Sequence, residues 1–264
     1  MPTMATGKRR EILICGVQFD EQLRSGAMSV LELAPIAARL GAQGVEYRTV
    51  YWKDKASELP RVRQQLQQMG LKGTYATFTT LYNREPEKQR QLMLDLEDAH
   101  ALGSPHLRVF RGERPGDGPE DAGMRDATMA VIDRAAAYGM RLALENFART
   151  PGNQMSEVKE AVERLNSPVL GVNLDTSNYV INHQDPVEAV RLLGPWVMYC
   201  HLKDARQTAE GLKPTYLGNG IIRIPEIIAA LDALGRDIPL CFEFGGEGDP
   251  EGAIVKSLAY MASV

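Results

Sequence analysis

The sequence predicts an α/β fold, a single (β/α)8 barrel, from two observations. Short apolar segments alternate with amphipathic segments along the whole chain, and parallel strands need a crossover helix between each pair. The 264 residues, divided among eight such units, give 33 residues per unit, close to the size of this architecture. An open doubly wound sheet is the alternative, but no GxGxxG fingerprint follows the first predicted strand.

Eight apolar segments are expected to form the strands. Between them, apolar residues recur at helical spacing, as at Val158, Ala161, Val162 and Leu165. A Gly follows the last Leu or Met of several of these helical segments, which is a common way for a helix to end. The expected strands are residues 12–17, 44–48, 71–76, 107–110, 141–145, 169–175, 197–201 and 240–243.

The chain is expected to be one domain, residues 10–264, preceded by a flexible tail, residues 1–9. Hydrophobic residues make up 44% and charged residues 24% of the sequence, which is typical of globular proteins. No apolar run approaches the 18 residues of a membrane span. The net charge of −4 argues against a nucleic-acid partner. Three widely spaced cysteines without a CxxC pair predict reduced thiols and a cytoplasmic location.

Three connections are longer than usual and follow the carboxyl ends of predicted strands, where barrel enzymes build their sites. We expect them to be loops that shape a binding site. They are residues 77–86, 111–123 and 204–223.

Polar residues end the last four predicted strands. Side chains alternate between the two faces of a strand, and in these strands one parity is aliphatic and should face the helices. The other parity ends in Glu145, Asp175, His201 and Glu243, which should therefore point into the barrel and converge.

Three carboxylates and one imidazole in one place are costly unless a cation joins them. The sequence therefore predicts a divalent metal held by Glu145, Asp175, His201 and Glu243. Mostly oxygen ligands with one His suit Mn2+ first, with Mg2+, Co2+, Zn2+ and Fe2+ as alternatives. The competing interpretation is that each acid pairs with an Arg inside the barrel.

Five motifs, in this order, resemble the xylose isomerase-like barrel superfamily, in its sugar phosphate isomerase/epimerase group. The resemblance covers essentially the whole chain and implies the same four metal ligands. Many relatives have His at the position of Phe147. The ketose 3-epimerases have His at the position of Asn178. The motifs are LENF (144–147), NLDTSN (173–178), HLKDAR (201–206), LGNGIIRIPEIIAAL (217–231) and FEFGGEG (242–248).

The resemblance implies an isomerase or epimerase of a monosaccharide or keto-sugar. Glu145 and Glu243 would be the catalytic pair, removing and returning a proton alpha to a carbonyl through an enediolate that the metal stabilises. A lyase or dehydratase that eliminates a beta substituent from a keto-sugar, keto-inositol or 3-keto-glycoside is the alternative. A non-catalytic barrel subunit and an endonuclease IV-like enzyme are further alternatives; too few His residues argue against the last.

Four further residues are expected to bind the substrate: Asn178, Lys203, Arg206 and Glu46. For Lys203 the alternative is an ion pair with a neighbouring acid, for Arg206 a solvated loop position, and for Glu46 a structural pair. Acidic residues in the glycine-rich segment 245–252 would repel a phosphate, so we expect a neutral sugar or keto-sugar. The expected partners are this carbohydrate and a second copy of the chain or a partner subunit.

Overall fold

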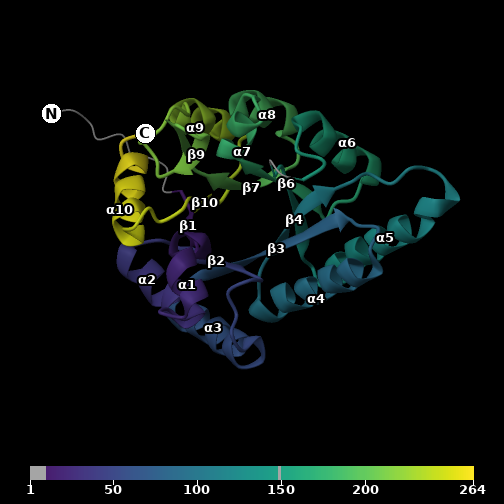
Figure 1. Ribbon diagram of the computed structural model, residues 1–264, viewed down its shortest axis with the longest axis horizontal. Coiled ribbons are helices and arrows are strands. Elements are labelled where there is room, and N and C mark those ends of the chain that lie inside the picture. Colours follow the sequence, from purple (N-terminus) through teal and green to yellow (C-terminus); the bar gives the residue numbers. More distant parts are fainter. Residues whose placement is uncertain (1–9, 148–149) are drawn as a thin grey trace.

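Eight parallel strands close into a barrel in the computed structural model, which describes residues 10–147 and 150–264 (Figure 1). The order around the barrel is β1-β10-β7-β6-β5-β4-β3-β2, so the first and last barrel strands pair. The predicted fold is confirmed. The barrel strands are β1 (Ile12–Cys15), β2 (Gly44–Arg48), β3 (Lys72–Tyr82), β4 (His106–Gly112), β5 (Arg141–Glu145), β6 (Leu170–Asp175), β7 (Val197–Leu202) and β10 (Leu240–Phe242).

Helices encircle the strands, as Figure 1 shows. Several end where the sequence predicts: Gly41 and Gly103 follow the last residues of α2 and α4 with φ of 83° and 84°, a conformation that favours glycine. The helices are α1 (Asp20–Ser25), α2 (Leu33–Leu40), α3 (Lys55–Met69), α4 (Pro86–Leu102), α5 (Ala122–Ala137), α6 (Met155–Leu165), α7 (Thr176–Ile181), α8 (Pro186–Leu193), α9 (Ile224–Asp232) and α10 (Pro250–Met261).

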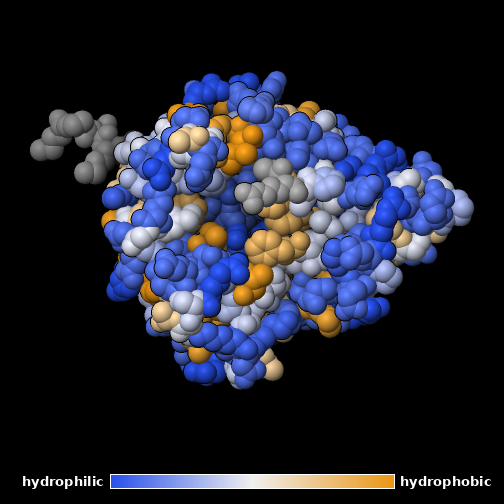
Figure 2. Space-filling model, in the orientation of Figure 1, coloured by the Kyte–Doolittle hydropathy of each residue, from blue (hydrophilic) through white to orange (hydrophobic). Residues whose placement is uncertain are grey.

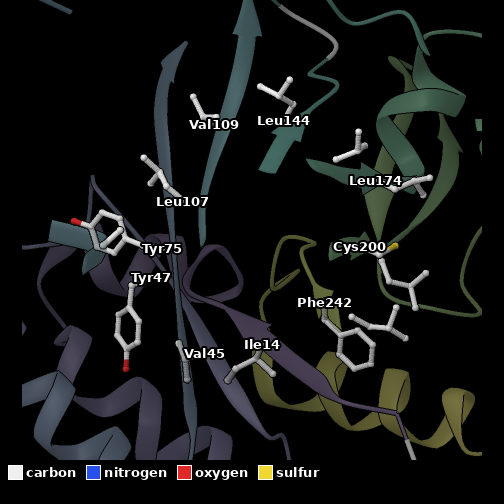
Figure 3. Close-up of a cluster of buried hydrophobic side chains, with 14 of the residues drawn as sticks. Ile14, Val45, Tyr47, Tyr75, Leu107, Val109, Leu144, Leu174, Cys200 and Phe242 are labelled. Atoms are coloured by element: carbon white, nitrogen blue, oxygen red, sulfur yellow. The ribbon is translucent and has the colours of Figure 1, made fainter. Parts of the chain in front are cut away.

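The two faces of the strands differ as their alternation predicts. Outward side chains such as Leu144, Leu174 and Phe242 belong to the large apolar core between strands and helices (Figure 3). A separate small cluster contains Leu13, Cys15, Tyr199 and Cys241. This second set fills the barrel interior and closes it below the polar residues at the strand ends.

Two of the expected loops contain strands instead. β3 continues to Tyr82, because after a register shift between Ala76 and Thr80 it pairs with the end of β4. Residues 204–223 begin with an antiparallel hairpin, β8 (Asp204–Thr208) and β9 (Gly211–Thr215). Its strands are short and weakly apolar, so periodicity did not reveal them.

The division of the chain into a tail and one domain, residues 10–264, stays a prediction. The expected tail, residues 1–9, lies outside the described residues. Within residues 10–147 and 150–264, no helix is both long and apolar enough to cross a membrane.

Candidate active site

The four predicted ligands meet at the carboxyl end of the barrel. Glu145 ends β5, Asp175 ends β6, His201 lies in β7, and Glu243 directly follows β10. The strand register places them at similar heights along the barrel axis. Asp175 lies opposite His201 on β6, and Cys241, two residues before Glu243, lies opposite His201 on β10. All four side chains are buried, and Glu243 is the most exposed at 7%.

His201 lies at the centre of this group. Its Nδ1 atom lies 2.9 Å from Oε2 of Glu145, 3.8 Å from Oε2 of Glu243 and 4.0 Å from Oδ2 of Asp175. Among the described residues this nitrogen makes no hydrogen bond. The opposite nitrogen, Nε2, lies 2.8 Å from Oε2 of Glu46. The Nδ1 atom of the ring therefore faces three carboxylates, and the Nε2 atom is held by a fourth carboxylate, that of Glu46.

Glu46 is completely buried on β2, across the barrel from His201. Its second oxygen accepts a hydrogen bond of 3.4 Å from the Cys15 thiol. Both oxygens are thus engaged inside the barrel, which favours the structural pair that the sequence offered as the alternative to a substrate contact.

Two asparagines orient the acids. The Asn173 amide donates to Oε2 of Glu145 at 2.7 Å. Asn178 donates to Asp175 twice, from its backbone N–H at 3.0 Å and from its side-chain amide at 2.8 Å. The first of these bonds caps the start of α7, so helix formation and carboxylate orientation depend on the same contact.

Three cations balance the acids. Lys203 places its ammonium 2.7 Å from Oδ2 of Asp175 and in contact with Glu243. Arg48 also pairs with Glu243. Arg108 pairs with Glu145 at 3.2 Å and donates to the Thr77 carbonyl at 2.7 Å. The ion pair expected as the alternative role of Lys203 is therefore present.

These contacts shift the protonation of the cluster. Burial alone would raise the pKa of Glu46, but His201 and Arg108 lower it to about 2. Burial alone would lower the pKa of His201, but Glu46 and Glu145 raise it to about 9. Burial likewise opposes ionisation of Glu145, yet Arg108 and His201 hold its pKa below the usual range. Burial raises the pKa of Asp175, which Lys203 only partly offsets. The surroundings therefore favour the ionised forms of Glu46 and Glu145.

Aromatic rings lie beside the charged cluster. The Arg108 guanidinium lies 4.4 Å from the centre of the Phe110 ring, which stacks on Phe147 at 4.7 Å. Arg48 lies 5.5 Å from the ring centre of Phe78, a residue 42% exposed. Figure 2 shows a hollow on this face with hydrophilic residues in its depth and apolar residues beside it. Such a boundary suits a ligand with polar groups and an apolar face.

Arg206 is not brought into the cluster. It lies on β8 with its side chain 48% exposed, and its Nε atom is 3.7 Å from Oε1 of Glu247. It could reach a ligand only from the rim of the site.

Sequence reasoning missed the role of Asp204. This buried carboxylate accepts backbone N–H bonds from Gly218, Gly220 and Ile222 at 3.2, 3.0 and 2.9 Å. These bonds hold residues 218–222, which follow the hairpin, against Asp204, the neighbour of Lys203 in the sequence. An Asp three residues after the end of the predicted strand 197–201, with Gly218 and Gly220 downstream, was the available signal.

The donor set fits a divalent ion. Ligand atoms of Glu145, Asp175 and His201 all lie within 4.8 Å of one another, and Glu243 reaches the same histidine nitrogen. That nitrogen is buried and makes no hydrogen bond in the described part of the chain, and a divalent ion that displaced its proton would take its lone pair. A neutral imidazole whose other nitrogen is held by a carboxylate is the usual arrangement of a metal-binding histidine.

Comparisons with known proteins agree with this architecture. A segment of 125 residues is 29% identical to a ketose 3-epimerase from Arthrobacter globiformis. The match covers 46% of this chain and only 41% of that relative. The D-allulose 3-epimerase from Methylomonas sp., solved in complex with D-allulose, superposes with a TM-score of 0.74 at 20% identity over 98% of this chain and 99% of that one.

A third similar structure is the IOLI protein with a bound zinc atom, with a TM-score of 0.74 and 19% identity over 96% of this chain and 97% of that one. At these identities the structures show a shared fold. The family model described as xylose isomerase-like TIM barrel matches residues 34–264. Since that match covers most of the sequence, the chain belongs to the xylose isomerase-like TIM barrel family.

Proposed function

We propose that this chain is a divalent-metal-dependent isomerase or epimerase of a monosaccharide or keto-sugar, which moves a proton on a carbon beside a carbonyl. The observation that carries the proposal is the convergence of three carboxylates on Nδ1 of His201, all within 4.0 Å. The epimerase names of similar proteins support the same reaction class.

The metal would be held by Glu145, Asp175, His201 and Glu243. When bound, it would polarise a substrate carbonyl and its neighbouring hydroxyl and so acidify the C–H between them. Mn2+ is our first choice, on the predominance of oxygen ligands, and the zinc atom in the IOLI structure keeps Zn2+ among the alternatives.

Glu145 and Glu243 are the proposed proton carriers. Their strands are separated by β6 and β7 in the barrel, so the two carboxylates enter the site from different sides. The lowered pKa of Glu145 keeps that carboxylate ionised, which is the form in which a base accepts a proton. If one glutamate takes the proton and the other returns it to the opposite face, the carbon is inverted. Return to the neighbouring carbon gives an isomer instead.

Substrate binding is assigned to Asn178, Lys203 and, from the rim, Arg206. Asn178 and Lys203 are each 5% exposed and directly contact the proposed ligands. Glu46 is proposed to act through His201 and not on the substrate, because it lies on the far side of that ring.

A lyase acting on a keto-sugar or keto-inositol is the second candidate, and Lys203 is the observation that favours it. Its ammonium contacts Glu243, so a proton donor lies directly beside a proposed base. Elimination needs that combination: one group removes the proton and another protonates the departing oxygen.

The proposed reaction predicts exchange of one substrate proton with solvent. Protein loaded with Mn2+ is incubated in D2O with ketoses, inososes and 3-keto-glycosides, and proton loss is followed by NMR. Exchange with formation of an epimer or aldose supports the isomerase, and exchange with loss of the beta substituent supports the lyase. Glu145→Gln and Glu243→Gln should each suppress exchange. No exchange with any sugar, with the metal verifiably bound, would overturn the proposal.

Cellular location and assembly remain proposals as well. The three cysteines, Cys15, Cys200 and Cys241, are buried and unpaired, and we propose a cytoplasmic protein on that basis. The homo-oligomer expected from the sequence stays a prediction.

A further inference from the structure

We infer that the substrate of this site carries a carboxylate, which Lys203 and Arg48 bind. The inference rests on the proposed function and narrows its substrate class. It departs from the neutral sugar that the sequence alone favours, because it depends on cations whose positions only the structure shows.

The first argument is the balance of buried charge. Four carboxylates contact His201, and three cations contact those carboxylates. A divalent ion bound at Nδ1 requires a neutral imidazole, so the side chains then carry a net −1 and the ion changes this to +1. None of the seven ionic residues is more than 7% exposed, and an uncompensated buried charge is costly. A monoanionic substrate brings the total to zero, whereas a neutral sugar leaves it at +1. The carboxylates are Glu46, Glu145, Asp175 and Glu243, and the cations are Arg48, Arg108 and Lys203.

The three cations are not equivalent. Arg108 is completely buried, and its guanidinium is occupied by Glu145, the Thr77 carbonyl and the face of Phe110. It is a fixed counterion. Arg48 and Lys203 instead contact Glu243 and retain slight exposure, 6% and 5%. These two lie where a ligand entering the site can reach them.

Arg48 also has unused hydrogen-bonding capacity. Its Nε atom, like that of Arg108, is buried and makes no hydrogen bond among the described residues, so the two arginines differ in exposure and not in this atom. The guanidinium lies 5.5 Å from the ring centre of Phe78, which is 42% exposed. A planar fork of donors in this position matches the geometry of a carboxylate.

Lys203 competes with a metal for the same oxygens. Its ammonium lies 2.7 Å from Oδ2 of Asp175 and contacts Oε2 of Glu243, and both carboxylates belong to the proposed ligand set. A divalent ion that takes these oxygens weakens two acceptors of Lys203 and one of Arg48. A substrate carboxylate replaces them in both charge and hydrogen bonding, whereas a hydroxyl group replaces only the hydrogen bonds.

The test compares sugars that differ only in the carboxylate. Binding of D-fructuronate and D-fructose, and of D-tagaturonate and D-tagatose, is measured by isothermal titration calorimetry on the Mn2+-loaded protein. We expect the acid of each pair to bind about tenfold to 100-fold more tightly, the range for a charge-assisted contact. Equal affinity within each pair would overturn the inference.

Variants separate binding by the cations from binding to the metal itself. Lys203→Gln and Arg48→Gln should each reduce the preference for the acid, while Lys213→Gln, which removes an exposed lysine on β9, should leave it unchanged. A preference that persists in the Lys203→Gln/Arg48→Gln double variant would assign the carboxylate to the metal and overturn the inference. Thermal unfolding checks that each variant is folded.

The same pairs of sugars distinguish this inference from the proposed function. Proton exchange in D2O with the neutral ketoses, together with equal affinity for both members of a pair, refutes the carboxylate and leaves the isomerase proposal intact. Tight, Lys203-dependent binding of the acids without proton exchange on any substrate refutes the isomerase and leaves carboxylate binding established.

Discussion

Two buried histidines face the same tyrosine inside the barrel, yet their surroundings have opposite effects. The ring centre of Tyr199 lies 4.4 Å from that of His106 and 5.5 Å from that of His201. Burial lowers the pKa of His106 to about 4, whereas Glu46 and Glu145 overcome the same burial at His201 and raise its pKa to about 9. Both rings are buried, so it is the carboxylates around His201 that make the two pKa values differ.

The difference marks the two ends of the barrel. His106 begins β4 at the amino end, beside apolar and weakly polar side chains, whereas His201 lies near the end of β7 among four carboxylates. The amino end of the barrel contributes to stability, and the carboxyl end gathers the charged side chains of the proposed metal site. This division is common in barrel enzymes.

Replacing each histidine by asparagine should give the largest contrast. His201→Asn removes the nitrogen shared by three carboxylates, so we expect metal affinity to fall by more than about 100-fold, beyond the effect of residues that only support a ligand. His106→Asn should leave metal affinity unchanged. Calorimetric titration with Mn2+ measures both. Equal losses in the two variants would show that the rings share one role.

The pH dependence of stability should separate the histidines in protein stripped of metal with a chelator. The folded-state pKa of His201, about 9, exceeds its ordinary value of 6.5. Its contribution is therefore complete below pH 6.5 and is lost as the pH rises to 9. The pKa of His106, about 4, is below 6.5, so stability is lost as the pH falls from 6.5 to 4.

Each titration can change the free energy of unfolding by up to about 1.4 kcal/mol per pH unit. Urea denaturation across this pH range measures it. His201→Asn should flatten the alkaline side of the profile, and His106→Asn the acidic side. Profiles that stay parallel to that of the unmodified protein would contradict the assigned protonation states.

Glu46 should support His201 without binding the metal. Glu46→Gln keeps the shape of the side chain but removes the charge beside Nε2, so we expect metal affinity to fall by about 10- to 100-fold. Glu58→Gln is the matched control, since this buried acid accepts backbone bonds at the start of α3 and should affect stability alone. Unchanged affinity in Glu46→Gln would remove Glu46 from the site.

The sequence was sufficient for the part of the site that local alternation controls. Glu145, Asp175, His201 and Glu243 end strands at one parity, and closure of the barrel brings them together. The contact between Glu46 and His201 joins strands on different sides of the barrel and 155 positions apart, so it depends on the stagger of the closed sheet. Arg48 and Lys203 have long, flexible side chains with several acids within reach. The spacing of residues along the sequence therefore cannot predict which acid each one contacts.

The smallest expected effect concerns the tyrosine between the histidines. Its hydroxyl shares a buried hydrogen bond of 3.1 Å with Thr74, so Tyr199→Phe should lower the free energy of unfolding by about 1 kcal/mol. Tyr47→Phe is a suitable control, because that buried hydroxyl has no partner among the described residues and its loss should cost nothing. Urea denaturation measures both. Because the Tyr199 ring remains, metal affinity should be unchanged in Tyr199→Phe; a loss of affinity would mean that the two ends of the barrel communicate through this hydroxyl.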